Sequence, residues 1–217
     1  MAATARTVVE ALNGALKRVP VLPLYFVALA PGAWLFLAAL TGRLGFEPMK
    51  ALEQGLGLWA LRFMIATLAA TPLLDWTGLR LVRFRRMLGL TAFYYALAHL
   101  ATYLALDQQF GWSFILADLA KRPYIIIGMA AFAALVPLAL TSTDAMVRRL
   151  GAAAWRKLHR LAYPAAAMMA LHYLLLVKSW TAEPLAYAAI VVVLLALRLV
   201  PRRAPRRAAG RVAAQQA

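Results

Sequence analysis

The stretch RKLHRLAYPAAAMMALHYLLL, residues 156–176, places two histidines, His159 and His172, in an almost purely apolar segment. The run from 161 to 177 is broken only by His172, and its length is typical of a helix that crosses a bilayer. Ionisable side chains inside a membrane are costly and usually face a cavity, a partner or a cofactor. This stretch therefore predicts both a membrane-spanning helix and a functional histidine within it.

Five further apolar runs resemble this one in length. Backbone groups in lipid must be hydrogen-bonded internally, so each run is expected to be a helix. The predicted fold is an all-α membrane protein, a bundle of six transmembrane helices in the lipid bilayer. The six candidate spans are residues 21–40, 54–74, 87–106, 123–140, 161–177 and 184–200.

The composition supports this fold class and excludes several functions. The chain is 64% hydrophobic with a mean hydropathy of +0.71, too apolar for a soluble domain of 217 residues. It has no cysteine, which excludes thiolate-ligated clusters, covalently attached haem and thiol catalysis. The net charge of +16 lies between the apolar runs and at the C-terminus, so we interpret it as a topology signal and expect no nucleic acid partner.

The basic residues predict the orientation. Of the 24 Lys and Arg, 18 lie in the segments on one side of the predicted bundle and 5 in the opposite loops. By the positive-inside rule, both termini are cytoplasmic. The first apolar run is interpreted as a retained helix, not a cleaved signal peptide. The predicted organisation is a cytoplasmic segment over 1–20, a transmembrane domain over 21–200 and a disordered basic cytoplasmic tail over 201–217.

Three ionisable side chains fall at nearly one predicted depth. At 1.5 Å per helical residue, His99 and His172 lie about 18 Å and about 17 Å from the inner edge, and Arg62 lies about 12 Å from the outer edge. Two neutral imidazoles facing each other within a bundle suit the axial ligation of a haem b iron. Arg62 is the candidate partner for a haem propionate, because its guanidinium forms bidentate pairs with carboxylates.

Simpler roles remain open for each residue. A lone intramembrane histidine is often a hydrogen-bonded packing residue, and Arg62 could extend outward to the headgroups. His159 sits among basic residues at the inner start of its helix, as a solvated turn or as a ligand of a second haem. His159 and His172 are thirteen positions apart, about 20 Å along a helix, and an ideal helix would place the two rings on different faces.

The positions of the three histidines resemble those of a known family of membrane proteins. A histidine on the third span and a His-x12-His pair on the fifth look like the ferric-reductase-like transmembrane domain, which ferric reductases and NADPH oxidases share. The closer similarity is to the MsrQ (YedZ) family, the haem-binding membrane subunit of the protein-methionine-sulfoxide reductase system. The matching stretches are RRMLGLTAFYYALAHLATYLAL, KRPYIIIGMAAFAALVPLALTSTDAMVRRLG, WRKLHRLAYPAAAMMALHYLLLVK and FMIATLAATPL.

The resemblance implies a protein of the bacterial inner membrane that takes electrons from quinol. It would pass them to a periplasmic molybdopterin-containing methionine-sulfoxide reductase, which repairs oxidised proteins. The implied haem ligands are His99 and His172, with His159 a further haem-associated position. FMN is also implied, without any residue to hold it.

One position departs from the two-haem oxidases of this superfamily. Their second histidine on the third span would fall at position 85, where this chain has Arg85, followed by Arg86. His159 therefore lacks the partner that a second bis-histidine site needs. We expect Arg85 and Arg86 to contact quinol or a propionate at the inner rim, beside His159. The alternative functions are a haem subunit of another electron-transfer system, such as a ferric reductase, and a cofactor-free transporter.

Overall fold

The structure is a computed structural model, and it describes residues 2–177 and 181–199; the predicted tail over 201–217 lies outside them. The described residues form helices and contain no strand, which confirms the all-helical prediction. In chain order the helices are α1 (Ala2–Arg18), α2 (Val21–Leu40), α3 (Pro48–Thr77), η1 (Leu81–Phe84), α4 (Arg85–Thr102), η2 (Tyr103–Asp107), α5 (Trp112–Lys121), α6 (Pro123–Leu140), α7 (Asp144–Leu150), α8 (Ala152–Leu158), η3 (His159–Leu161), α9 (Ala162–Leu176) and α10 (Ala182–Ala196).

Four helical segments are long and apolar enough to cross a membrane. They are Val21–Leu40, Pro48–Thr77, Leu81–Asp107 and Pro123–Leu140. The fifth and sixth predicted spans fall on α9 and α10, which have 15 residues each. Fifteen residues rise only about 22 Å, less than the usual hydrocarbon thickness. The count of six spans therefore stays a prediction.

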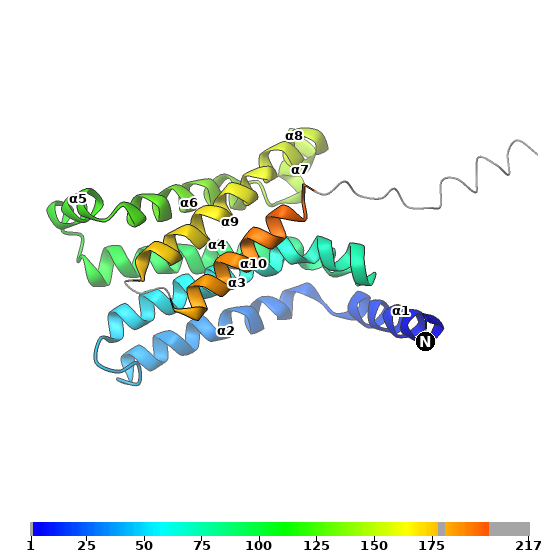
Figure 1. The fold of residues 1–217 in the computed structure, drawn as a ribbon, viewed down its shortest axis with the longest axis horizontal. Helices are drawn as coiled ribbons and strands as arrows, with labels where there is room; N and C mark the ends of the chain where they lie inside the picture. Colours follow the sequence, from blue (N-terminus) through cyan, green and yellow to red (C-terminus); the bar gives the residue numbers. More distant parts are fainter. Residues whose placement is uncertain (1, 178–180, 200–217) are drawn as a thin grey trace, which may run out of the picture.

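The six apolar helices α2, α3, α4, α6, α9 and α10 run side by side, and the connecting segments gather at the two ends of the bundle (Figure 1). The helices α1, α7 and α8 lie at one end, where the sequence predicts the cytoplasmic side. The loop between α2 and α3 and the helix α5 lie at the opposite end. The chain thus alternates between two ends. The end with α1, α7 and α8 is here named the inner end and the opposite one the outer end, after the orientation that the sequence predicts.

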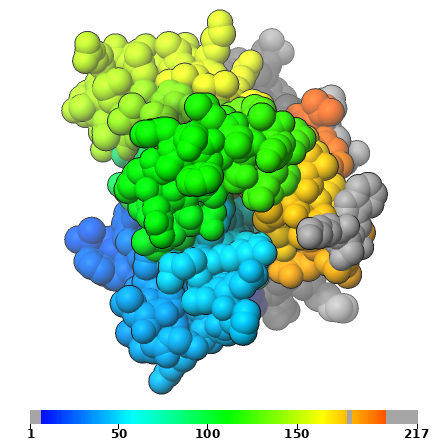
Figure 2. Space-filling view, turned by 90° about the vertical axis from the view of Figure 1, so that its left-hand side faces the viewer, coloured from blue at the N-terminus to red at the C-terminus, as the bar shows by residue number. Residues whose placement is uncertain are grey.

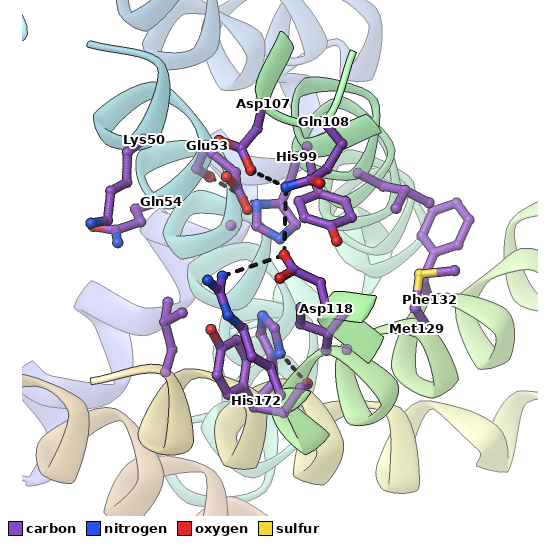
Figure 3. A pocket seen from close by; sticks show the side chains of 18 of the residues that line it. Lys50, Glu53, Gln54, His99, Asp107, Gln108, Asp118, Met129, Phe132 and His172 are labelled. Carbon is purple, nitrogen blue, oxygen red and sulfur yellow. Dashed lines mark hydrogen bonds and ion pairs between the residues drawn. The ribbon is translucent and has the colours of Figure 1, made fainter. Parts of the chain in front are cut away.

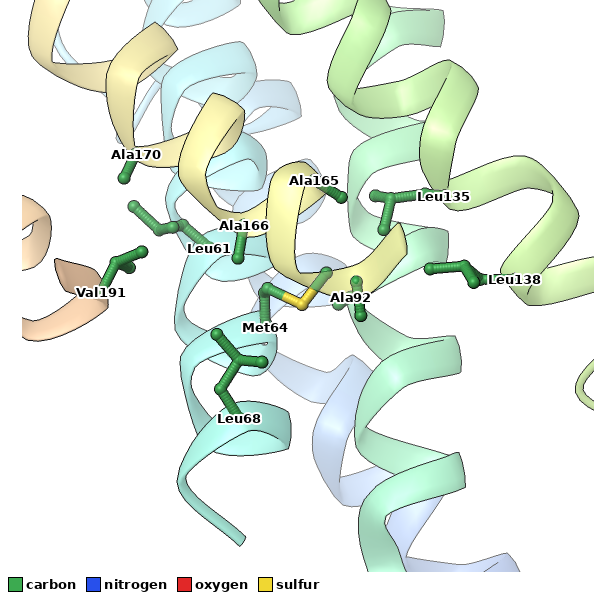
Figure 4. Packing of buried hydrophobic residues seen from close by; sticks show 11 residues of the cluster. Leu61, Met64, Leu68, Ala92, Leu135, Leu138, Ala165, Ala166, Ala170 and Val191 are labelled. Carbon is green, nitrogen blue, oxygen red and sulfur yellow. The ribbon is translucent and has the colours of Figure 1, made fainter. Parts of the chain in front are cut away.

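A core of small and branched side chains fills the inner half of the bundle. Ala92 of α4 and Ala165 and Ala166 of α9 are fully buried (Figure 4). Such small side chains allow α9 to pack closely on α6, and α4 on α3. Leucines from α3 and α6 and Val191 of α10 complete this cluster. The cavity around His99 and His172 lies in the outer half of the same helices.

A hydrogen bond from Arg198 beside Pro72 joins α10 to α3. Pro72 lies inside α3 and lacks an N–H, so the carbonyl of Leu68 has no helical donor. Arg198, just beyond α10, donates from Nη2 to this carbonyl at 2.8 Å. The Arg198 guanidinium thereby satisfies a backbone acceptor that the helix cannot satisfy itself.

The N-terminal segment, predicted only as cytoplasmic, forms the amphipathic helix α1. Its Asn13 donates from Nδ2 to the carbonyl of Gly78 at 2.9 Å and accepts from the N–H of Arg80 at 2.8 Å. Arg83 donates to the carbonyl of Leu16 at 2.7 Å. These bonds fix α1 against the turn that follows α3.

Candidate functional site

The structure brings together the imidazoles of His99 and His172. His99 lies on α4 and His172 on α9, and their ring centroids are 6.1 Å apart with an interplanar angle of 76° (Figure 3). When an imidazole binds a metal ion at about 2 Å, its ring centroid lies about 3.2 Å from that ion, so two imidazoles on one ion could have centroids up to about 6.3 Å apart. The distance between the two centroids is therefore compatible with a shared metal ion.

The hydrogen bonds of both rings set their tautomer. Nδ1 of His99 lies 2.8 Å from the carbonyl oxygen of Glu53, and Nδ1 of His172 lies 2.7 Å from that of Tyr124. A carbonyl oxygen only accepts, so each Nδ1 carries the hydrogen and donates it. Each Nε2 then keeps a free lone pair, the form in which a neutral histidine ligates a metal.

Two glycines make room for the histidines. Gly57 follows Glu53 by four residues on α3, and Gly128 follows Tyr124 by four residues on α6. A Cβ would lie 3.1 Å from Nδ1 of His99 if added at Gly57, and 2.8 Å from Nδ1 of His172 if added at Gly128. Each imidazole thus packs on a helix where a missing Cβ exposes the carbonyl one turn earlier.

The same arrangement occurs a third time, at a tyrosine. The hydroxyl of Tyr95 accepts from the N–H of Gly32 at 2.8 Å and donates to the carbonyl of Ala28 at 2.9 Å. It thereby inserts between a donor and an acceptor that are four residues apart on α2, beside Pro31. Because Tyr95 and His99 are one turn apart, α4 is fixed to α2 and α3 through two adjacent glycine contacts.

A cavity of about 1150 Å³ surrounds the two histidines. At its inner end it is lined by apolar side chains, among them Leu61, Ala96 and Leu135, two of which also belong to the packed core. Its outer end is polar: Lys50, Glu53, Tyr103, Asp107, Gln108, Asp118, Lys121 and Arg122 line it. The cavity is larger than most small-molecule sites and suits a macrocycle with an apolar body and a polar edge.

The outer mouth of the cavity is built by α5 and the turns before it. Gln108 donates to Asp107 at 2.7 Å, and Arg122 pairs with Asp118 at 3.4 Å. Figure 2 looks onto this end, where α5 and the start of α3 lie in front. The positive charge of Arg122 is favoured there, since the neighbouring Tyr124 and Asp118 raise its pKa, against a smaller effect of burial.

His159 does not join the pair. It lies at the inner end in η3, a short 3-10 segment that interrupts the helix between α8 and α9. Its ring stacks on Trp155 with centroids 3.7 Å apart, its Nδ1 lies 3.1 Å from the carbonyl of Trp155, and its Nε2 lies 3.4 Å from the hydroxyl of Ser142. The ring is thus engaged by neighbours on the inner side of the packed core.

The arginines at position 85 and 86 lie near His159. Arg86 forms an ion pair with Asp144 at 2.7 Å and holds the pKa of that carboxyl below its usual value. Burial lowers the pKa of His159, and the positive charges of Arg85 and Arg86 lower it further. The structure therefore groups these residues at the inner end, away from His99 and His172.

Arg62 lies outside the cavity, on the side of α3 that faces α10. Its Nε donates to the hydroxyl of Tyr187 at 2.7 Å, its guanidinium lies 4.9 Å from the ring centroid of Trp59, and its Nη2 is 3.9 Å from Glu183. The cavity is lined by Lys121 and Arg122 and not by Arg62. The sequence missed these residues and both glycines, although a glycine within an apolar run was a usable signal.

Comparisons with known proteins identify the family of this chain. The family described as Ferric reductase like transmembrane component matches residues 56–170, which include His99 and His159. Curated proteins from Brucella ovis, Brucella canis and Brucella suis are each 53% identical over 176 residues, 81% of this chain and 80% of the relative. Each is named Protein-methionine-sulfoxide reductase heme-binding subunit MsrQ. The chain belongs to the ferric-reductase-like transmembrane family and, within it, to the MsrQ family.

Proposed function

We propose that this protein is a b-type cytochrome subunit that carries electrons from membrane quinol to a periplasmic methionine-sulfoxide reductase containing molybdopterin. It would lie in the bacterial inner membrane with six spans and both termini in the cytoplasm. The sulfoxide chemistry belongs to the partner, and this chain supplies the electrons. The names of the Brucella relatives support the haem and the partner.

One observation carries the proposal. Two imidazoles with ring centroids 6.1 Å apart line a large cavity, and Nδ1 of each donates its hydrogen to a backbone carbonyl. A packing histidine would satisfy both ring nitrogens with protein partners. Here the second nitrogen of each ring is left for a ligand. A haem held by His99 and His172 would supply one-electron chemistry.

The chain's own residues fix the site in advance. The carbonyls of Glu53 and Tyr124 hold the two imidazoles in fixed orientations. The two rings would therefore need little rearrangement when a bound haem gains or loses an electron. The apolar inner wall around Leu61 and Leu135 excludes water from one side. The cations of the outer mouth, Lys50, Lys121 and Arg122, could pair with the carboxylates of a haem, and the opening there offers electrons a way to an outer partner.

The rim of this mouth is a suitable docking surface for the partner. Phe46, Phe110, Trp112 and Phe114 are all more than half exposed at the outer end. Gln109 and Phe110 both adopt a positive φ, 46° and 56°, which is unusual for residues other than glycine and is typical of functional loops. Exposed aromatic side chains around a redox centre favour a contact with another protein.

The decisive experiment reconstitutes the chain with a purified molybdopterin methionine-sulfoxide reductase and drives it with decylubiquinol. The expected result is quinol-dependent sulfoxide reduction that His99→Ala and His172→Ala both abolish. A second arm offers ferric chelates in place of the reductase. Faster electron delivery to the chelates than to the reductase would contradict the proposed partner and favour a ferric reductase.

A further inference from the structure

A group of side chains around Arg62, on the side of α3 that faces α10, is not used by the site described above. Arg62 of α3 donates to Tyr187 of α10 at 2.7 Å and stacks against Trp59, with Glu183 at 3.9 Å. The side chains of Arg62 and Glu183 are 37% and 56% exposed. Arg62, Trp59, Glu183 and Tyr187 are here named the Arg62 cluster.

Arg62 has donors to spare. A guanidinium carries five N–H groups, and Tyr187 takes the one on Nε. Glu183 lies beyond direct hydrogen-bond distance at 3.9 Å, close enough to attract but not to occupy the fork. A half-exposed guanidinium at this depth needs oxygen acceptors, because a charged group facing lipid is costly. The cluster therefore fits an oxygen-bearing molecule that approaches from the bilayer.

The Arg62 cluster lies one side chain away from the haem cavity. Tyr173, the residue after His172, lines the cavity, and its ring packs edge-on against Tyr187 with centroids 6.0 Å apart. A molecule held at Arg62 would thus be separated from the histidine pair mainly by Tyr173. By contrast, the inner rim at Arg85 and Arg86 lies beyond the packed core of the bundle.

We propose that the Arg62 cluster binds the head group of quinol, an inference that rests on the proposed function. One ring oxygen accepts a hydrogen bond from the Arg62 guanidinium, and the opposite hydroxyl donates to the Glu183 carboxylate. The quinol ring lies beside Trp59 and Tyr187, whose rings hold the guanidinium in place, and its apolar tail remains in the bilayer. This location replaces the inner rim expected from the sequence.

The chemistry of the cluster distinguishes quinol from a lipid phosphate. Both offer oxygen acceptors to Arg62, but a phosphate is anionic and would meet the charge of Glu183 at the same site. A neutral quinol uses both members of the pair, because it accepts from the arginine and donates to the carboxylate. Two aromatic rings within 6 Å of the guanidinium hold it in a fixed position between α3 and α10.

The test compares Arg62→Gln and Glu183→Gln with a matched control, Arg198→Gln. Both arginines join α3 to α10, but Arg198 does so through the carbonyl of Leu68. The readouts are the Kd for oxidised decylubiquinone, the KM for decylubiquinol in haem reduction, the spectrum after dithionite and the melting temperature. Arg62→Gln should raise Kd and KM about tenfold to a hundredfold, because the quinone or quinol loses one hydrogen bond from a charged donor.

The control separates binding from folding. Arg198→Gln should lower the melting temperature and leave KM within about twofold of wild type. An unchanged KM in Arg62→Gln, with or without loss of a co-purified anionic phospholipid, would overturn the inference. So would a rise in KM in Arg85→Ala/Arg86→Ala that Arg62→Gln does not show. Wild-type protein without haem would instead contradict the proposed function itself.

Discussion

Adding one methyl group at Gly128 should weaken haem binding. A Cβ at this position would lie 2.8 Å from Nδ1, 2.9 Å from Cε1 and 3.3 Å from Cγ of His172. Ordinary contacts begin at 3.4 Å, so the ring would have to retreat by about 0.6 Å. This retreat would stretch the 2.7 Å bond from Nδ1 to the carbonyl of Tyr124 beyond its normal range.

Two free-energy contributions with opposite signs decide the outcome of Gly128→Ala. Alanine is the better helix former by about 1 kcal/mol, so without the histidine the change should stabilise α6. Forcing a methyl group into a packed contact costs about 1–3 kcal/mol, and part of the histidine's hydrogen bond is lost as well. We expect haem to bind about tenfold to a hundredfold more weakly. Gly57→Ala should follow with a smaller loss, because its closest contact is 3.1 Å.

The assay measures haem per chain, the rate of haem transfer to an apo-haemoprotein acceptor and the melting temperature of the variants. Gly89→Ala is the matched control, since a Cβ there would meet Thr67 at an ordinary 3.7 Å. It should keep its haem and melt at or above the wild-type temperature. Equal haem retention in all three variants would refute the role of the glycines.

Three further predictions concern the scaffold. Tyr95→Phe removes the hydroxyl that bridges Gly32 and Ala28; we expect a loss of about 1–3 kcal/mol in unfolding free energy with haem retained, measured by thermal melting. Pro72→Ala should reduce the cost of Arg198→Gln, because a restored backbone N–H satisfies Leu68; a double-mutant cycle with additive losses would contradict this. Asp144→Asn should lower the melting temperature slightly near neutral pH. Because Arg86 lowers the pKa of Asp144, this difference should vanish as the pH falls through that lowered pKa, and a difference that persists in acid would count against the ion pair.

Four of the spans and the common level of His99 and His172 could be predicted from the sequence because both follow from counting. Apolar runs have the length of a helix across a bilayer, and a fixed rise per residue places His99 and His172 at one level. The rotation of each helix about its axis is not contained in such counts. It depends on contacts such as those of Gly57 and Gly128, which form between residues far apart in the chain.

Arg62 and His159 show the same difference between the depth of a residue, which counting gives, and the direction of its side chain, which it does not. Depth placed Arg62 at the level of the histidines, but the face of α3 on which it lies turns it towards Tyr187 and away from the cavity. For His159, the 3-10 segment at the start of α9 and the stacking on Trp155 determine where the ring points. Residues of the outer mouth were missed because α5 is a short helix within a predicted loop.

The central claim is that one haem is held between α4 and α9 by His99 and His172. The most direct test is the reduced spectrum and the haem-to-protein ratio of the detergent-purified chain and its three single His→Ala variants. We predict a Soret band and a sharp reduced α-band in the wild type, their near-complete loss in His99→Ala and His172→Ala, and their retention in His159→Ala. Colourless wild-type protein after expression with ample haem, or bands that persist without His99 or His172, would contradict it.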